Sequence, residues 1–210
     1  MIHAYDKIYL NQVQDSMGTM LHFVVHDMKW DINKYYDCFI SSGVARMLEH
    51  AEPQFAAGKS GYEIAYEVYY RIFGSSTDIK PNYVFGRSPE YFAGWSVAYY
   101  SWYKAKSFNE INRAVPIDTI VDMYMPYHEM DVMHFVDEID ARMSKYYDES
   151  RLKRLRSYAR LTQQELADKS GVSKRMIEQY EQGRKELKNA SVATVIKLAD
   201  VLRCDVRELV

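Results

Sequence analysis

Residues 161–185 read LTQQELADKSGVSKRMIEQYEQGRK, and this stretch constrains the fold more than any other part of the chain. Thr162 and Glu165 have the spacing of a capping box, in which each side chain accepts a hydrogen bond from a free backbone N–H group at a helix start. That helix ends at Gly171, because glycine adopts positive φ without steric cost. Ser173 then caps a second helix. The stretch therefore predicts two short helices joined by a tight turn.

The second predicted helix ends at Gly183 and has two chemically different sides. Met176, Ile177 and Tyr180 recur at helical spacing and mark the side that faces inward. The opposite side carries polar and basic side chains, namely Lys174, Arg175 and Gln179. Such a helix packs on a small core through one side and can present the other side to DNA.

These motifs resemble those of the Cro/lambda-repressor-like (XRE-type) helix-turn-helix family. In that family TQ opens the first helix, ELA lies within it, GVS forms the turn and I-x-x-Y-E-x-G closes the second helix. The same motifs stand here at residues 162–163, 165–167, 171–173 and 177–183. The resemblance implies a domain whose second motif helix enters the DNA major groove. A helical hairpin used only for packing is the alternative, and the number of matched positions counts against it.

The resemblance implies that the second helix reads base edges. Lys174, Arg175 and Gln179 match the base-reading positions of the family. Met176 departs from the family pattern, which often has a small polar residue there. A methionine offers only apolar contact, for example with a thymine methyl group.

Other matched positions imply contacts with DNA phosphates, which position a domain without reading the sequence. Gln163 stands at the N-terminus of the first motif helix, where the family contacts a phosphate. Arg184 and Lys185 follow the second helix and suit the same purpose. With the capping Ser173, the expected DNA-binding set is Gln163, Ser173, Lys174, Arg175, Met176, Gln179, Arg184 and Lys185.

Charge is distributed unevenly along the 210 residues. Residues 151–210 hold 14 Lys and Arg against 8 Asp and Glu, a net charge of +6. Residues 1–150 hold 13 against 21, a net charge of −8. Because DNA attracts basic surfaces and repels acidic ones, the asymmetry indicates a DNA-binding end joined to an end that senses a signal or binds another partner.

The chain before the motif repeats apolar residues at intervals of three to four, which predicts helices rather than strands. Capping residues, glycines and prolines divide it into segments. The expected helices are residues 10–28, 32 to the break at Gly43, 44–51 closed by Pro53, 61–73 between Ser60 and Gly74, 89–103 after Ser88, one after the capping box of Ser107 and Glu110, a short one after Pro116, and 132–143 after Asp131. A loop is expected at residues 74–86. The N-terminal domain is therefore predicted to be all-α.

The predicted helix around residues 91–103, YFAGWSVAYYSWY, has aromatic side chains on all sides, so more than one neighbour should cover it. Ala93, Gly94 and Ala98 would permit close approach by another helix. Of the 19 tyrosines, 17 precede residue 151, as do all three tryptophans. An aromatic helical core is the main interpretation, and an exposed aromatic interface is the second.

The polar residues 144–150, SKYYDES, are expected to connect two domains, residues 1–147 and residues 148–210. Ser191 caps a further helix, VATVIKLADVL, and Val206 with Leu209 closes a fifth short one. The fold prediction is thus all-α, with a helical N-terminal domain followed by a five-helix lambda-repressor-like domain. Its expected core is Leu152, Leu155, Leu166, Ala167, Val172, Ile177, Val195, Leu198 and Leu202.

No catalytic, cofactor-binding or metal-binding residue is predicted, so the chain is not expected to be an enzyme. His22 and His26 are four residues apart on one helix, but no third metal ligand accompanies them. His128 and Glu129 near His134 give an equally weak signal, and partly buried histidines explain both groups. No nucleophile, base and orienting group can be named together, and no glycine-rich phosphate loop is present.

A second resemblance concerns the N-terminal domain. The passage SPEYFAGWSVAYYSWYKAKSFNEI is similar to the N-terminal domains of XRE-type regulators that are encoded beside small toxin-like proteins. The resemblance implies an antitoxin that neutralises a toxin and represses its own operon. The alternative is a transcription factor that responds to a ligand or peptide held by the aromatic domain. An enzyme fused to a DNA-binding module is the least supported interpretation.

Proteins with this DNA-binding motif usually bind paired half-sites as two-fold dimers, so a homodimer is expected. No window of the sequence approaches about 18 apolar residues without charges, and the N-terminus lacks the pattern of an export signal. The two cysteines, Cys38 and Cys204, lie far apart and indicate no disulfide framework. A cytoplasmic protein without membrane contact is expected.

Overall fold

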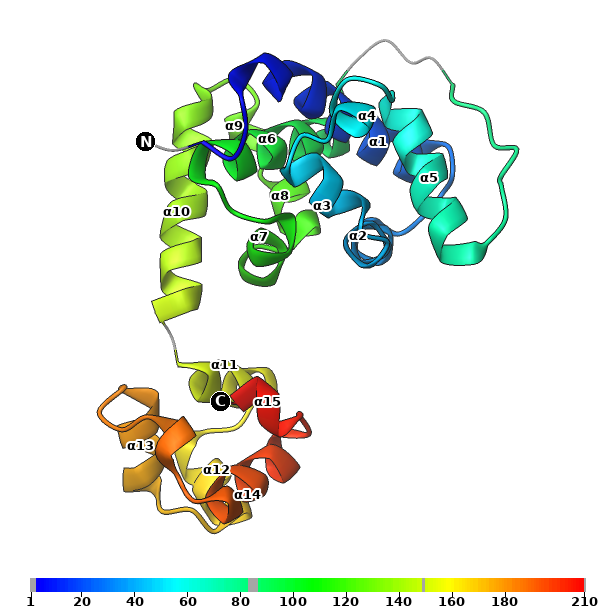
Figure 1. Ribbon diagram of the computed structural model, residues 1–210. Helices are drawn as coiled ribbons and strands as arrows, with labels where there is room; N and C mark the ends of the chain where they lie inside the picture. Colours follow the sequence, from blue (N-terminus) through cyan, green and yellow to red (C-terminus); the bar gives the residue numbers. More distant parts are fainter. Residues whose placement is uncertain (1–2, 83–86, 149, 210) are drawn as a thin grey trace. The chain divides into compact units, whose positions relative to one another are not determined.

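The computed structural model describes residues 3–82, 87–148 and 150–209, and all structural statements concern these residues (Figure 1). Within them the regular structure is entirely helical, which confirms the all-α prediction. The chain divides into two compact units, Met1–Met143 and Ser144–Val210, here called unit 1 and unit 2.

Unit 1 is a succession of helices. They are α1 (Leu10–His26), α2 (Ile32–Ser41), α3 (Val44–Glu49), α4 (Pro53–Ala56), α5 (Gly61–Phe73), α6 (Pro89–Lys104), α7 (Phe108–Ala114), α8 (Ile117–Asp122), α9 (Tyr124–Tyr127) and α10 (Val132–Asp148), preceded by the 3-10 turn Lys7–Tyr9. The part of the predicted loop that the structure describes, up to residue 82, contains no helix, and residues 83–86 lie outside the described residues.

Helix α10 crosses the division between the two units. The sequence placed the boundary after residue 147, whereas the division lies after residue 143. Phe135 and Met143 are buried in the core of unit 1, and the residues that follow Met143 are polar or exposed. The predicted connection at 144–150 is helical as far as residue 148, and residue 149 lies outside the described residues.

The predicted capping residues begin their helices. The Asp31 side chain accepts a hydrogen bond from the Lys34 N–H group at 3.0 Å, and the capping boxes begun by Ser60 and Ser107 are both complete. Pro53 follows the end of α3, as predicted, and it also occupies the first turn of α4, a short helix that the sequence did not predict. Proline suits that position, since the N–H group that it lacks would have no partner within the helix.

Helices α1 and α6 pack with their backbones in contact. A Cβ atom added to Gly94 in α6 would overlap the carbonyl oxygen of Met17 in α1. A Cβ atom added to Gly61, at the start of α5, would likewise overlap the carbonyl oxygen of Ser16. The close approach predicted for Gly94 is therefore confirmed, and α1 is held between α5 and α6.

Aromatic side chains fill much of the core of unit 1. Tyr35, Tyr36 and Tyr100 are at most 2% exposed, and Trp102 is 4% exposed. The Tyr100 hydroxyl donates a hydrogen bond to Asp140 at 2.6 Å. The predicted aromatic core is thus present, while other rings of the unit are only half-buried.

Unit 2 has the predicted five helices around a separate core (Figure 1). They are α11 (Arg151–Tyr158), α12 (Gln163–Ser170), α13 (Lys174–Glu181), α14 (Val192–Leu202) and α15 (Val206–Leu209), with a 3-10 turn at Leu187–Asn189. All nine predicted core residues belong to this cluster, although Leu155 is only partly buried.

We predict that Gly94→Ala destabilises unit 1. Overpacking a core costs about 1–3 kcal/mol and occasionally more, and a clash with backbone puts this substitution at the upper end. Urea unfolding followed by tryptophan fluorescence measures the loss, because all three tryptophans lie in unit 1.

Gly74→Ala is the matched control. Gly74 has φ +68° and no atom within 4 Å of an added Cβ, so alanine there costs only the left-handed backbone, about 1–2 kcal/mol. Equal losses from the two substitutions would contradict the backbone contact between α1 and α6.

Candidate nucleic-acid interface

Helix α12 begins at a complete capping box. The Thr162 backbone N–H group and hydroxyl donate to Glu165 at 2.7 and 2.8 Å, and the Glu165 N–H group donates back to the Thr162 hydroxyl at 3.1 Å. These bonds lower the pKa of Glu165, and the bond from the Thr162 backbone N–H group makes the largest contribution. Its carboxylate therefore stays ionised at the positive end of the helix dipole, where negative charge is stabilising.

The turn between α12 and α13 is fixed by glycine and two serines. Gly171 has φ +67°, and the Ser170 hydroxyl donates to the Leu166 carbonyl at 2.6 Å while accepting from the Val172 N–H group at 3.2 Å. Ser173 then caps α13 by accepting from its first turn. This serine is exposed, so it lies at the surface beside the start of α13.

Helix α13 has the two predicted sides. Ile177 is fully buried and Tyr180 is 7% exposed, whereas Lys174 and Arg175 are exposed. Arg175 makes no hydrogen bond or ion pair with any residue in the described ranges. Its five N–H donors are available to a partner, and a guanidinium can bind guanine through two parallel hydrogen bonds. Gln179 is half-buried on the same helix.

Two of the remaining predicted residues meet beside α13. Met176 is half-buried against the core of unit 2, and the Lys185 Nζ atom lies 3.8 Å from its Sδ atom. The Lys185 N–H group donates to the Gln179 carbonyl at 3.1 Å, which returns the chain toward the helix after Gly183. Arg184 and Lys185 are exposed, as their predicted contact with phosphates requires.

A buried ion pair joins the ends of three helices, and sequence analysis missed it. The Arg156 guanidinium binds both carboxylate oxygens of Glu181, at 2.7 and 2.9 Å, and donates to the Leu161 carbonyl at 2.8 Å. The Glu181 side chain is 2% exposed and that of Arg156 is 14% exposed. Glu181 was visible in the sequence only as part of a motif, and periodicity gives no sign of its partner in α11.

Gln163 adds a third contact to this pair. Its Nε2 atom donates to Glu181 at 2.8 Å, so α12 is linked to the end of α13. Since a glutamine amide carries two N–H donors, the second one is left for a group outside the domain. The predicted phosphate contact of Gln163 therefore stays a prediction, now restricted to that second donor or to its backbone.

Residues 152–209 match a protein-family model described as helix-turn-helix. The matched residues run from α11 to α15 and contain the capped helices, the glycine turn and the exposed side of α13. This segment is an XRE-type helix-turn-helix domain. The chain is accordingly a DNA-binding regulator of transcription. Comparison with curated proteins and with solved structures found no match.

Outside the helix-turn-helix domain, the histidine pair on α1 that the sequence singled out has ordinary partners. The His22 Nδ1 atom lies 2.9 Å from the Ser88 hydroxyl, and the His26 Nε2 atom lies 2.8 Å from the Glu90 carboxylate. Burial lowers the pKa of His22, with a further contribution from His26. In the described ranges no three His, Cys, Asp or Glu residues are grouped as metal ligands, and no helix is long and apolar enough to cross a membrane.

We predict that Glu181→Gln destabilises the helix-turn-helix domain by about 3–5 kcal/mol, because it removes the buried carboxylate charge that the Arg156 guanidinium binds through two hydrogen bonds. Urea unfolding followed by circular dichroism should show an earlier transition for this domain. The tryptophan fluorescence transition, which reports unit 1 alone, should not move.

Glu178→Gln serves as the control on the same helix. Glu178 lies 3.9 Å from Lys174, and both side chains are exposed by more than a third, so its loss should cost less than about 1 kcal/mol. If both variants unfold at the same urea concentration, the buried pair does not hold the domain together.

Proposed function

We propose that the helix-turn-helix domain recognises an operator by placing α13 in the DNA major groove. The observation that carries this proposal is the exposed side of α13, where Arg175 has no partner among the described residues and Lys174 is held only by a weak surface pair. Base edges in the major groove offer the acceptors that such donors bind.

The surroundings of α13 support the same orientation. Ser173, Arg184 and Lys185 are exposed at its two ends, where they can contact phosphates on either side of the groove. The ion pair of Arg156 and Glu181 keeps the end of α13 fixed against α11 and α12. The regulator thus acts by binding, and we propose no catalytic step for it.

We predict that Arg175→Ala weakens binding to operator DNA by about 1–3 kcal/mol and relaxes the preference at one base pair, because a bidentate contact with a base is lost. Lys185→Ala should weaken binding to all sequences alike and lower the salt dependence of affinity. Gel-shift titration at fixed salt, with the operator and with point variants of it, separates the two effects.

Arg207→Ala is the charge-matched control, since Arg207 is fully exposed on the short helix α15 and belongs to no predicted DNA contact. It should change operator affinity only slightly. Unchanged affinity in both Arg175→Ala and Lys185→Ala would refute the assignment of α13 as the recognition helix.

We further propose that the regulator binds DNA as a homodimer. A single α13 contacts too few base pairs for selective binding, and paired half-sites about 34–36 Å apart solve this problem in proteins with this motif. Light scattering at micromolar concentration should give twice the chain mass, and a footprint should cover two half-sites. A monomer with a footprint over one half-site would contradict this proposal.

For unit 1 we propose an antitoxin function, in which it binds and neutralises a toxin while the helix-turn-helix domain represses the shared operon. The support is the resemblance of the passage at residues 88–111, together with the net charge of −8 on residues 1–150, which cannot favour DNA. Half-buried aromatic rings such as Tyr99 and Tyr103 are of the kind that protein interfaces use.

Coexpression tests the antitoxin function. The product of a small reading frame beside this gene should stop growth when expressed alone, and the full chain should restore growth. Arg175→Ala should restore growth equally well while binding the operator poorly. Growth arrest that persists in the presence of the full chain would rule out the antitoxin function and favour the alternative, a ligand-responsive regulator.

A further inference from the structure

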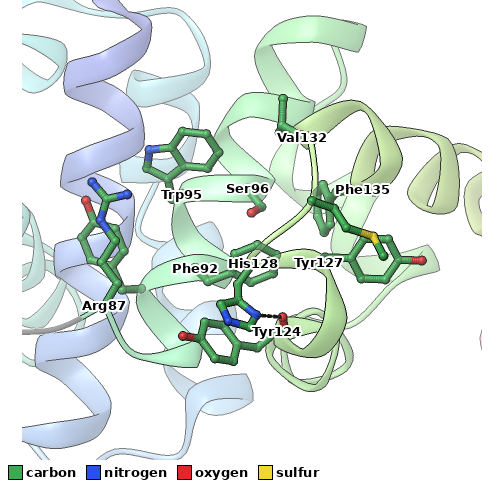
Figure 2. Close-up of a pocket in the computed structure, with 11 residues that line it drawn as sticks. Arg87, Phe92, Trp95, Ser96, Tyr124, Tyr127, His128, Val132 and Phe135 are labelled. Carbon is green, nitrogen blue, oxygen red and sulfur yellow. Dashed lines mark hydrogen bonds between the residues drawn. The ribbon is translucent and has the colours of Figure 1, made fainter.

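Unit 1 contains an aromatic pocket that nothing above has assigned (Figure 2). Its volume is about 450 Å³, within the range of roughly 300–1,000 Å³ typical of small-molecule sites. It opens between α6, α9 and the start of α10. Phe92 and Trp95 come from α6, Tyr124 and Tyr127 from α9, and Phe135 from α10.

The walls of the pocket hold one another in place. The Phe92 ring meets Tyr124 and Phe135 edge to face, with ring centres 5.7 and 5.9 Å apart. His128 stacks on Tyr124 at 4.2 Å, and its Nδ1 atom lies 2.9 Å from the Tyr124 carbonyl oxygen. Because a carbonyl only accepts, Nδ1 carries a hydrogen and the imidazole is fixed. A pocket with such fixed walls loses little freedom when a flat ligand enters.

The pocket has one polar group at its floor. Ser96 lines it from α6, is fully buried, and its Oγ atom has no hydrogen-bond partner. A buried hydroxyl without a partner costs free energy that a hydrogen bond would recover. Figure 2 shows the aromatic rings gathered around this serine. Because this Oγ atom is covered in the empty pocket, a ligand atom can form the missing bond by displacing the side chains that cover it.

Among the described residues that line the pocket, Arg87 is the only lysine or arginine, and it lies at one side (Figure 2). Its guanidinium lies 5.4 Å from the centre of the Tyr91 ring, and it forms no ion pair with a residue in the described ranges. Two nearby acidic groups have other partners, since Asp15 accepts from the Tyr91 hydroxyl at 2.8 Å, and the Glu129 carboxylate, 82% exposed, lies 3.5 Å from the His128 Nε2 atom. Arg87 is therefore available to a carboxylate.

From these features we propose that the pocket binds a small planar aromatic carboxylate, whose rings lie among Phe92, Trp95 and Tyr124 and whose carboxylate pairs with Arg87. This inference deepens the alternative function, a ligand-responsive regulator, and it does not depend on operator binding. Binding is measured without DNA, so failure of the pocket and failure of operator recognition are separate results.

The test is isothermal titration of the full chain with naphthalene-2-carboxylate and with its uncharged counterpart, naphthalene-2-carboxamide. The carboxylate should bind one site per chain, about tenfold more tightly than the amide, because a charge-assisted hydrogen bond is lost with the charge. Arg87→Gln should remove this difference and leave amide binding unchanged. Arg46→Gln, at an exposed position of α3 outside the pocket, should preserve the difference.

Ser96→Ala gives an independent readout. Without ligand, this variant should melt at a temperature equal to or above that of the parent chain, because the unpaired buried hydroxyl is gone, and its affinity for both compounds should fall. The proposal is overturned if naphthalene-2-carboxylate does not bind at millimolar concentration. It is equally overturned if the preference for the carboxylate survives in Arg87→Gln.

Discussion

The fold of unit 1 depends on the contact between the backbones of α1 and α6. Gly94 allows α6 to lie against the Met17 carbonyl, and Gly61 brings α5 onto the same helix. A side chain can adopt another rotamer to relieve a close contact, but main-chain atoms cannot. These contacts therefore fix the position of α1 between α5 and α6. The opposite side of α6 then faces α8 and α9, so its aromatic residues divide between the core and the pocket.

The helix-turn-helix domain relies on polar contacts in addition to its small apolar core. Arg156, Gln163 and Glu181 come from three different helices, and the Arg156 guanidinium and the Gln163 amide each lie within 3 Å of the Glu181 carboxylate. Replacing such a group with apolar residues of the same volume is often neutral for stability. What the polar group adds here is a specific orientation of α13 relative to α12, which the proposed recognition of bases by α13 requires.

Local chemistry made much of this structure predictable. Capping serines, aspartate and glycines gave the starts and ends of the helices, and the apolar spacing gave the core of the helix-turn-helix domain. The ion pair of Arg156 with Glu181 was not predictable, since it joins residues 25 positions apart whose proximity depends on packing. The pocket was not predictable for the same reason, because Ser96 and Phe135 line it together only through the packing of α6 and α10. Helix α9 was not predicted, because its four residues are too few to show a periodic apolar pattern.

The glycine contact also sets the rotational register of α6. Each residue of an α-helix turns the chain by about 100°, so the position of Gly94 against α1 decides where Trp95 and Ser96 point. One residue inserted between Phe92 and Gly94 would leave the glycine in place but turn Phe92 by about 100°, away from the pocket. The described part of the loop before α6, up to residue 82, contains no helix and so has no such register. Length changes should accordingly be tolerated there and excluded from the helix between Phe92 and Gly94.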